Sequence, residues 1–147
     1  MRYLGLDLGS RTLGISISDK TGLIASSYKT INHNEEYNRL VNDVVNIVND
    51  ENIDAIVLGF PKNMNNTIGP KGELSKSFKE KLESKLSIPI FLEDERLSTK
   101  SATDILISGN VSRKNRKKVV DSVAATIILQ SYLDKENRKW KRIHLQW

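Results

Sequence analysis

The sequence predicts a single α/β domain with a mixed five-stranded sheet flanked by helices, and three observations support this class. Apolar strand-like runs alternate with amphipathic helical segments, which favours layers of helix on sheet. The first three runs are separated by short turns, which favour an antiparallel meander. A helical segment then separates the third run from the fourth, as in a crossover between parallel strands.

The first half of the chain supplies three strands and one helix. Residues 2–8 form an apolar run typical of a buried strand, and residues 12–18 alternate between apolar and small or polar side chains. The turn at residues 19–22 leads into a third strand over residues 22–31. Residues 35–51 predict a helix because apolar side chains recur on one face. These are Tyr37, Val41, Val44 and Val48.

The middle of the chain continues the alternation. Residues 53–59 are a β-branched run typical of a buried strand, and the Gly-, Pro- and Asn-rich segment 60–72 predicts a loop. A helix with one apolar stripe follows, and residues 89–92 predict the next strand. The stripe comprises Leu74, Phe78, Leu82 and Leu86.

The C-terminal third predicts two more helices and a tail. Ser98 can cap a short helix over about residues 98–107, which a Gly-Asn pair then ends. A longer helix runs over about residues 114–133. We expect residues 1–134 to form the domain and residues 135–147 to form a loosely ordered basic tail.

The net charge of +5 is concentrated in two segments. Residues 113–118 carry +5 and residues 135–147 carry +4, which leaves a net charge of −4 on the rest of the chain. This asymmetry favours a polyanionic partner, nucleic acid first, although charge runs are also common on ordinary solvated surface. The first segment supplies most of the expected substrate-binding residues: Arg113, Lys114, Arg116, Lys117 and Lys118.

Three acids lie in apolar surroundings: Asp7 within the first strand, Glu95 after the last strand, and Asp121 in the final helix. A carboxylate is costly to bury without an opposite charge, so the three could meet around a divalent cation. Gly5 and Gly9 lie two residues from Asp7 on its own face, and we expect them to leave bare space for a metal or a phosphate. The alternatives are a surface charge cluster at Glu95 and a helix N-cap or solvated position at Asp121.

The surroundings of Asp121 favour a position close to the sheet. Ala124 and Ala125 follow it by one helical turn, and their small side chains would let this face of the helix lie against the strands. A set of ligands made only of carboxylates suits Mg²⁺ or Mn²⁺ rather than Zn²⁺.

Other residues set limits or offer weaker candidates. The chain has no cysteine, no signal-peptide pattern and no apolar stretch of the roughly 20 residues that a membrane helix needs. We therefore expect a soluble, cytoplasmic protein that does not act on membranes. Arg11 and Arg96 are possible phosphate contacts, and His33 and His144, without a second ligand at metal spacing, are expected to be ordinary surface residues.

The predicted meander followed by a crossover sheet matches the layout of the ribonuclease H-like fold, and four segments resemble the YqgF family of RuvC-like Holliday junction resolvases. Members of that family are also regarded as nucleases for the precursor of small-subunit ribosomal RNA. The segments, in family order, read GLDLGSRTLG at 5–14, GFPKNMNNTIGP at 59–70, DERLST at 94–99 and KVVDSVAA at 118–125. The resemblance reaches from residue 1 to about 134 and does not cover the tail.

The resemblance implies metal-dependent hydrolysis of phosphodiester bonds, with Asp7, Glu95 and Asp121 as catalytic ligands of Mg²⁺ or Mn²⁺. One ion would activate water and a second would stabilise the leaving oxygen. The chain is accordingly expected to be an endonuclease for structured nucleic acid that processes the 5′ end of pre-16S ribosomal RNA.

Three alternatives stay open on the sequence alone. One is a Holliday junction resolvase in DNA recombination and repair, and another is a non-catalytic RNA-binding factor for ribosome assembly. A third is nucleotide handling, because the Asp-Leu-Gly-Ser segment at 7–10 resembles the first phosphate loop of actin-like ATPases, although those proteins need two lobes and this chain offers one. Basic charge recognises phosphate rather than sugar or base, so RNA and DNA substrates both fit, as do a monomer and a dimer.

Overall fold

The computed structural model describes residues 1–61, 68–94 and 113–144, with side chains in the last segment described for residues 121–139. The elements follow the predicted order of three strands, a helix, a strand, a helix, a strand and a final helix. They are β1 (Tyr3–Leu8), β2 (Thr12–Ser18), β3 (Ala25–Asn32), α1 (Tyr37–Asp50), β4 (Ala55–Phe60), α2 (Pro70–Glu83), β5 (Ile90–Asp94) and α4 (Arg113–His144).

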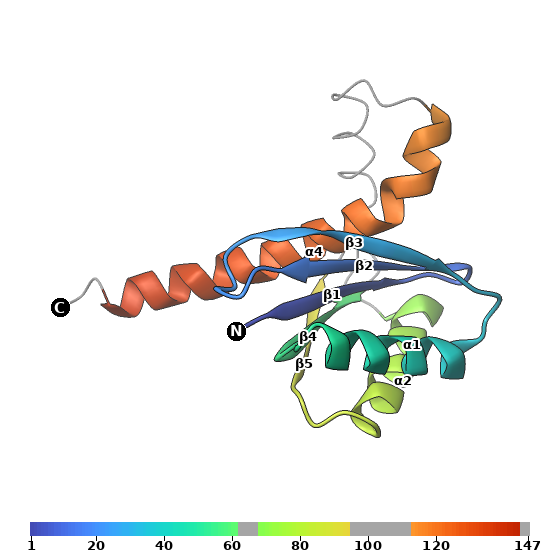
Figure 1. The fold of residues 1–147 in the computed structure, drawn as a ribbon, viewed down its shortest axis with the longest axis horizontal. Coiled ribbons are helices and arrows are strands. Elements are labelled where there is room, and N and C mark those ends of the chain that lie inside the picture. The colour runs from blue at the N-terminus through green and yellow to red at the C-terminus, as the bar shows by residue number, and fades with distance from the viewer. Residues whose placement is uncertain (62–67, 95–112, 145–147) are drawn as a thin grey trace.

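The five strands form one mixed sheet in the order β3-β2-β1-β4-β5, which confirms the predicted fold class. β1 pairs with β2, and β2 with β3, in antiparallel fashion, as short connections require. β1 pairs with β4, and β4 with β5, in parallel, because a helix intervenes each time. Figure 1 shows α1 and α2 on one face of the sheet and α4 crossing the other.

The period-two alternation of β1 divides its side chains between the two faces. Leu4, Leu6 and Leu8 belong to the main core, which they form with the buried side chains of α1 and α2. Tyr3 packs on the opposite face, against a second cluster that joins Val57 of β4 to three residues of α4. Those three are Ile128, Leu129 and Leu133. Full burial of a Leu or Ile side chain stabilises the fold by about 1.5–3 kcal/mol, so the two clusters hold the three layers together.

Two glycines let α4 lie directly on the backbone of the sheet. A Cβ atom added to Gly5 would lie 2.8 Å from Cβ of Leu129, and one added to Gly14 would lie 2.1 Å from the carbonyl oxygen of Asp121. No real side chain tolerates such distances, so both positions require glycine. The buried Ser16 hydroxyl also donates to the Ala125 carbonyl over 2.8 Å. The predicted close approach at Ala124 and Ala125 is confirmed, and both are fully buried.

The C-terminal prediction was wrong over residues 135–144. We expected a loose tail, whereas the backbone continues as α4 to His144 and extends beyond the sheet (Figure 1). No Gly or Pro interrupts this stretch, and its Lys, Glu and Arg residues favour helix. Lys139 pairs with Glu136 one turn earlier at 3.3 Å, and the Asn137 side chain donates to the Gly22 carbonyl over 3.4 Å. The helix predicted over 98–107 lies outside the described residues.

Candidate active site

Asp7 lies at the carboxyl end of β1, on the face that α4 covers. Its position alternates with Leu6 and Leu8, which point into the main core, so its carboxylate lies on the other side of the sheet. Its antiparallel partner on β2 is Gly14. Residues that are directly opposite in an antiparallel pair project to the same face, so the space above Gly14 adjoins the half-buried Asp7 side chain.

Asp121 occupies the space above Gly14. A Cβ atom at Gly14 would lie 2.1 Å from the Asp121 carbonyl oxygen and 3.2 Å from its Cβ. Asp121 is well inside α4, which excludes the alternative of a helix N-cap. Because Gly14 is the partner of Asp7, the chain brings these two predicted acids to one corner of the sheet. Both side chains are half-buried.

The glycines that serve this corner differ from those expected. The space above Gly5 is filled by the Ser16 hydroxyl and Leu129, and a Cβ at Gly9 would meet the Thr12 carbonyl at 3.3 Å, so the prediction that both leave bare space for a ligand was wrong. The glycines beside Asp7 come instead from neighbouring strands. One is Gly14, and the other is Gly59 of β4, one step beyond the paired residues Leu6 and Leu58. Strand register, which the sequence does not specify, was needed to find them.

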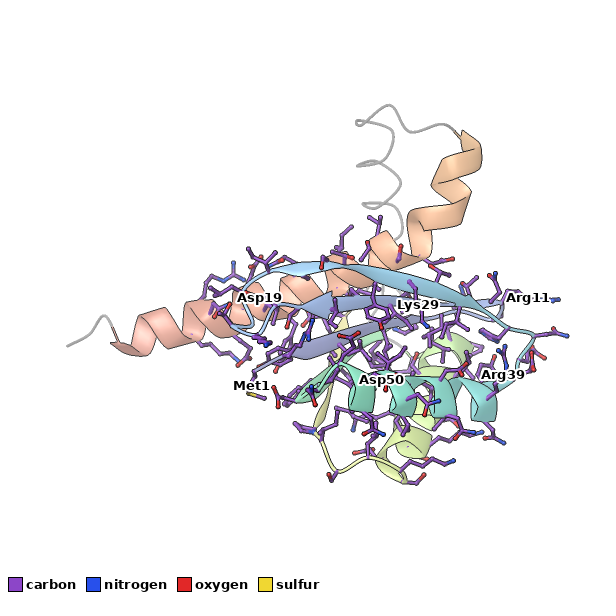
Figure 2. The ribbon with its side chains drawn as sticks, viewed as in Figure 1. Met1, Arg11, Asp19, Lys29, Arg39 and Asp50 are labelled. Carbon is purple, nitrogen blue, oxygen red and sulfur yellow. The ribbon has the colours of Figure 1, made fainter. Side chains whose placement is uncertain are left out.

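The remaining predicted site residues are only partly covered by the structure. Glu95 follows the last residue of β5, and both it and Arg96 lie outside the described residues. The described part of the chain holds no group of three potential metal ligands, and it includes two of the three predicted acids. Arg11 is exposed at the turn between β1 and β2 (Figure 2), where its Nη1 donates to Oδ1 of Asn34 over 3.1 Å. The backbone of α4 is described for the cluster Arg113, Lys114, Arg116, Lys117 and Lys118, whereas its side chains are not.

A second acid on the same face, Glu93 of β5, was not predicted to be buried. It is only 5% exposed, forms an ion pair with the ammonium of Lys135 and receives a hydrogen bond of 3.4 Å from the Ser131 hydroxyl. This pair ties the C-terminal half of α4 to the edge strand. The neighbouring Tyr132 stacks on Phe91 at 5.4 Å, and burial, with smaller contributions from nearby acids, raises the pKa of Tyr132 to about 12.

His33 was also misjudged, because it is buried rather than on the surface. It is 7% exposed and lies immediately after β3, where its Nε2 is 2.9 Å from the carbonyl oxygen of Gly9. Gly9 follows Asp7 by two residues. The pairing of Asn32 with Thr12 brings the end of β3 to this turn, and that register was not readable from the sequence.

A hollow of about 430 Å³ lies at the opposite end of the sheet, between the end of α1 and the entry to β5. Asn52, Asp54 and Lys85 are among its lining residues. It contains a single acid and lies at the amino end of β4, whereas Asp7 is at the carboxyl end of the parallel β1. Ligand sites in open α/β sheets form at the carboxyl ends of strands, so the Asp7–Asp121 corner is the better candidate.

Among the described helices, none combines the length and the apolar character of a membrane span.

Sequence comparison places the chain among proteins related to nucleases. Residues 1–135 match a family model described as RuvX, Holliday junction resolvase. A relative from Bacillus licheniformis is 52% identical over 140 residues, which covers 93% of this chain and 99% of the relative, and one from Bacillus subtilis is 50% identical over 138 residues, which covers 93% and 100%. Both carry the name "putative pre-16S rRNA nuclease".

Comparison with solved structures supports the fold. RuvC of T. thermophilus, solved in complex with a Holliday junction substrate, superposes with a TM-score of 0.60 at 13% identity and covers 93% of this chain and 96% of its own. The Fowlpox virus resolvase, in complex with Holliday junction DNA, gives 0.58 at 14% identity, with coverage of 92% and 98%. The ribonuclease H-like architecture is thereby confirmed. The chain belongs to the RuvX family, also called YqgF, and is a nuclease that hydrolyses phosphodiester bonds.

Proposed function

We propose that this protein is an endonuclease that depends on Mg²⁺ or Mn²⁺ and cleaves structured nucleic acid, with the 5′ end of pre-16S ribosomal RNA as its substrate. The observation that carries the proposal is the placement of Asp121 over Gly14, which is the strand partner of Asp7. Two carboxylates at one corner of the sheet can share a divalent cation, which offsets their mutual repulsion. Such a corner on a nuclease scaffold is therefore best explained as half of a metal site.

The donor set fits a hard divalent cation. Asp7 and Asp121 offer only carboxylate oxygens, which Mg²⁺ and Mn²⁺ accept. We propose Glu95 as the third ligand and third catalytic acid, since it directly follows Asp94 at the carboxyl end of β5, and the carboxyl ends of the parallel strands β1, β4 and β5 lie at one edge of the sheet. The metal, when bound, would activate water and stabilise the leaving oxygen of the phosphodiester.

The basic residues near this corner are suited to hold the phosphates of the substrate. The cluster 113–118 ends three residues before Asp121 in the same helix, and the first turns of α4, drawn in orange, rise away from the sheet (Figure 1). A rise of about 1.5 Å per residue keeps the whole cluster within about 12 Å of Asp121 along the helix axis. We assign phosphate contacts to Arg11, Arg96, Arg113, Lys114, Arg116, Lys117 and Lys118.

Two substrates follow from the comparisons, and the RNA precursor is favoured. Relatives that are about half identical over nearly the whole chain carry the ribosomal RNA name, whereas the junction-bound structures are only 13–14% identical and support the fold alone. Processing of this RNA would place the protein in the cytoplasm. Resolution of four-way DNA junctions is the second candidate, because the matching family model carries that description.

The test is cleavage by the purified protein with Mg²⁺, on an RNA that carries the pre-16S 5′ leader and on a four-way DNA junction. Asp7→Asn should lower the rate at least about 100-fold, and Asp121→Asn and Glu95→Gln should act similarly, since even second-layer groups of metal sites cost about 10–100-fold. Asp50→Asn is the matched control, because Asp50 is exposed on α1, on the other face of the sheet (Figure 2). Cleavage by Asp7→Asn at the wild-type rate would show that Asp7 is not part of the site. Faster cleavage of the DNA junction than of the RNA would make the junction the favoured substrate.

A further inference from the structure

We propose that His33 is a positioning residue of this nuclease: its Nε2–H group holds the turn between β1 and β2, and so fixes where Asp7 and Arg11 point. The inference rests on the proposed function, since it assumes that Asp7 is a metal ligand. It assigns a role to a buried histidine that is far from both basic segments in the sequence.

His33 fastens both ends of the turn that follows β1. Its ring Nε2 lies 2.9 Å from the carbonyl oxygen of Gly9, and its backbone N–H donates to the carbonyl oxygen of Arg11 over 2.9 Å. Within the turn, the N–H of Gly9 donates to the carbonyl of Thr12 over 2.8 Å. His33 is only 7% exposed as a residue, so competition by water is reduced, which strengthens these bonds.

The hydrogen bonds of the ring select one tautomer. The backbone N–H of Glu35 donates to Nδ1 of His33 over 3.1 Å, so Nδ1 must be an acceptor without a proton. In the neutral imidazole the proton is then on Nε2, which donates to Gly9. The edge of the ring also packs against Tyr37, with 5.5 Å between the ring centres.

The backbone of the segment is arranged around this ring. Glu35 has a φ of 60°, a left-handed conformation that is uncommon for residues other than glycine and that persists only where the surroundings hold it. In this conformation its N–H reaches Nδ1 of His33. The adjacent Asn34 accepts a hydrogen bond of 3.1 Å from Arg11, so residues 33–35 hold the Gly9 carbonyl and the Arg11 side chain together.

The chemical consequence concerns the geometry of the site. Asp7 is two residues before Gly9 at the end of its strand, so a shift of the turn moves the strand end that carries its carboxylate. A displacement of about 1 Å in a reacting constellation can lower a rate by about 100-fold. His33 therefore acts through Gly9 and Asp7 on the cleavage step, and not by touching substrate.

Two substitutions distinguish the roles of the two ring nitrogens of His33. In His33→Asn, the side-chain oxygen can take the place of Nδ1 and accept from Glu35, but nothing reaches Gly9. In His33→Gln, the longer amide can take the place of Nε2 and donate to Gly9. With an RNA that carries the pre-16S 5′ leader and saturating Mg²⁺, we expect His33→Asn to lower the single-turnover rate about tenfold or more. His33→Gln should restore the rate to within about threefold of wild type, and in both variants the RNA Kd should change less than the rate, since Arg11 is one of several phosphate contacts.

Wild-type cleavage by His33→Asn would overturn the inference, and so would equal losses in both variants that follow their melting temperatures. If His33→Asn does not fold, long-range ¹H–¹⁵N NMR of the wild-type protein decides instead: a proton on Nε2 and none on Nδ1 is the expected result, and the opposite tautomer overturns it. The two proposals fail separately. An inactive Asp7→Asn beside a fully active His33→Asn removes only the role of His33, whereas an active Asp7→Asn removes the metal site itself.

Discussion

Helix α4 packs beside an acid of the sheet at two places, and the group that it brings to the acid differs between them. Near its N-terminal end it brings a second carboxylate, Asp121, to Asp7, whereas near its C-terminal end it brings the ammonium of Lys135 to Glu93. Glu93 is 5% exposed, and Asp7 and Asp121 are half-buried. Glu93 is thus buried beside an ammonium group, whereas Asp7 and Asp121 stay half-buried at the corner where we propose the metal site.

The distance between α4 and the sheet also differs between these two places. Above Gly14 and Gly5 the helix backbone touches the strands, so the positions of the two acids are set by main-chain contact. At the edge strand the contact is made by side chains, with Tyr132 stacked on Phe91 at 5.4 Å. The position of α4 on the sheet is therefore fixed most precisely at the corner where we propose the catalytic site, and catalysis requires precise placement of the reacting groups.

The largest effect is expected from removing the charge of Asp121 at the corner that it shares with Asp7. We expect Asp121→Asn to lower cleavage at least about 100-fold, while the melting temperature without metal stays equal or rises slightly, because repulsion with Asp7 is relieved. Asp134→Asn, an exposed acid four turns later on the same helix, serves as the control for cleavage. A clear fall in melting temperature on Asp121→Asn would mean that its charge is stabilising and that the corner is another ion-pair network.

The next effect in size comes from pushing the helix off the sheet. Gly14→Ala places a Cβ 2.1 Å from the Asp121 carbonyl, a clash that backbone movement must absorb. We expect a loss of about 1–3 kcal/mol in the free energy of unfolding together with loss of cleavage, measured by urea titration and by the RNA assay. Gly9→Ala, whose Cβ would meet backbone at 3.3 Å, should lose much less stability. Equal stability of the two variants would show that α4 is free to shift.

The ion pair at the other end should matter for stability alone. Lys135→Met removes the ammonium group from the buried Glu93 carboxylate, which keeps its hydrogen bond from the Ser131 hydroxyl. We expect a loss of about 1–2 kcal/mol in the free energy of unfolding, with an unchanged cleavage rate per folded molecule. Lys135 is about half exposed, which keeps the loss modest. Adding Glu93→Gln to Lys135→Met should recover part of the stability. A cleavage defect in Lys135→Met would show that the two acid sites are coupled.

The smallest effect concerns acid sensitivity at the turn between β2 and β3. Hydrogen bonds, from the Thr21 hydroxyl first and then from the backbone of Ile24 and Leu23, lower the pKa of Asp19 from 3.8 to about 2. This contribution to stability is present above pH 3.8 and is lost as the pH falls towards 2. Asp19→Asn cannot titrate, so its urea midpoint should fall less between pH 4 and pH 2 than that of wild type. An identical fall in both proteins would contradict this assignment.

The features that the sequence predicted are those with a local signal. The apolar period of β1 placed Asp7 in a strand, and the one-sided stripes of Val41 and Val44 and of Phe78 and Leu82 located α1 and α2 to within a few residues. Ala124 and Ala125 indicated the close approach of α4 because small side chains on one helical face let the helix backbone lie near the strands.

The features that it missed depend on residues distant in the sequence. The role of Gly14 requires the register between β1 and β2, and burial of His33 requires β3 to end beside the turn at Gly9. The helical course of residues 135–144 was missed because the end of a chain was taken to be loose, although no helix breaker is present. Pairing across a sheet is set by the whole fold, and no window of sequence reports it.

The most direct measurement for the central claim is paramagnetic line broadening in ¹H–¹⁵N spectra of the free protein titrated with Mn²⁺. We expect broadening to begin at the amides of Asp7 and Gly14 and in α4 around Asp121, excess Mg²⁺ to reverse it, and Asp7→Asn to abolish it there. Broadening that centres on the hollow beside Asp54, while the amides around Asp7 stay sharp, would contradict the proposed metal site.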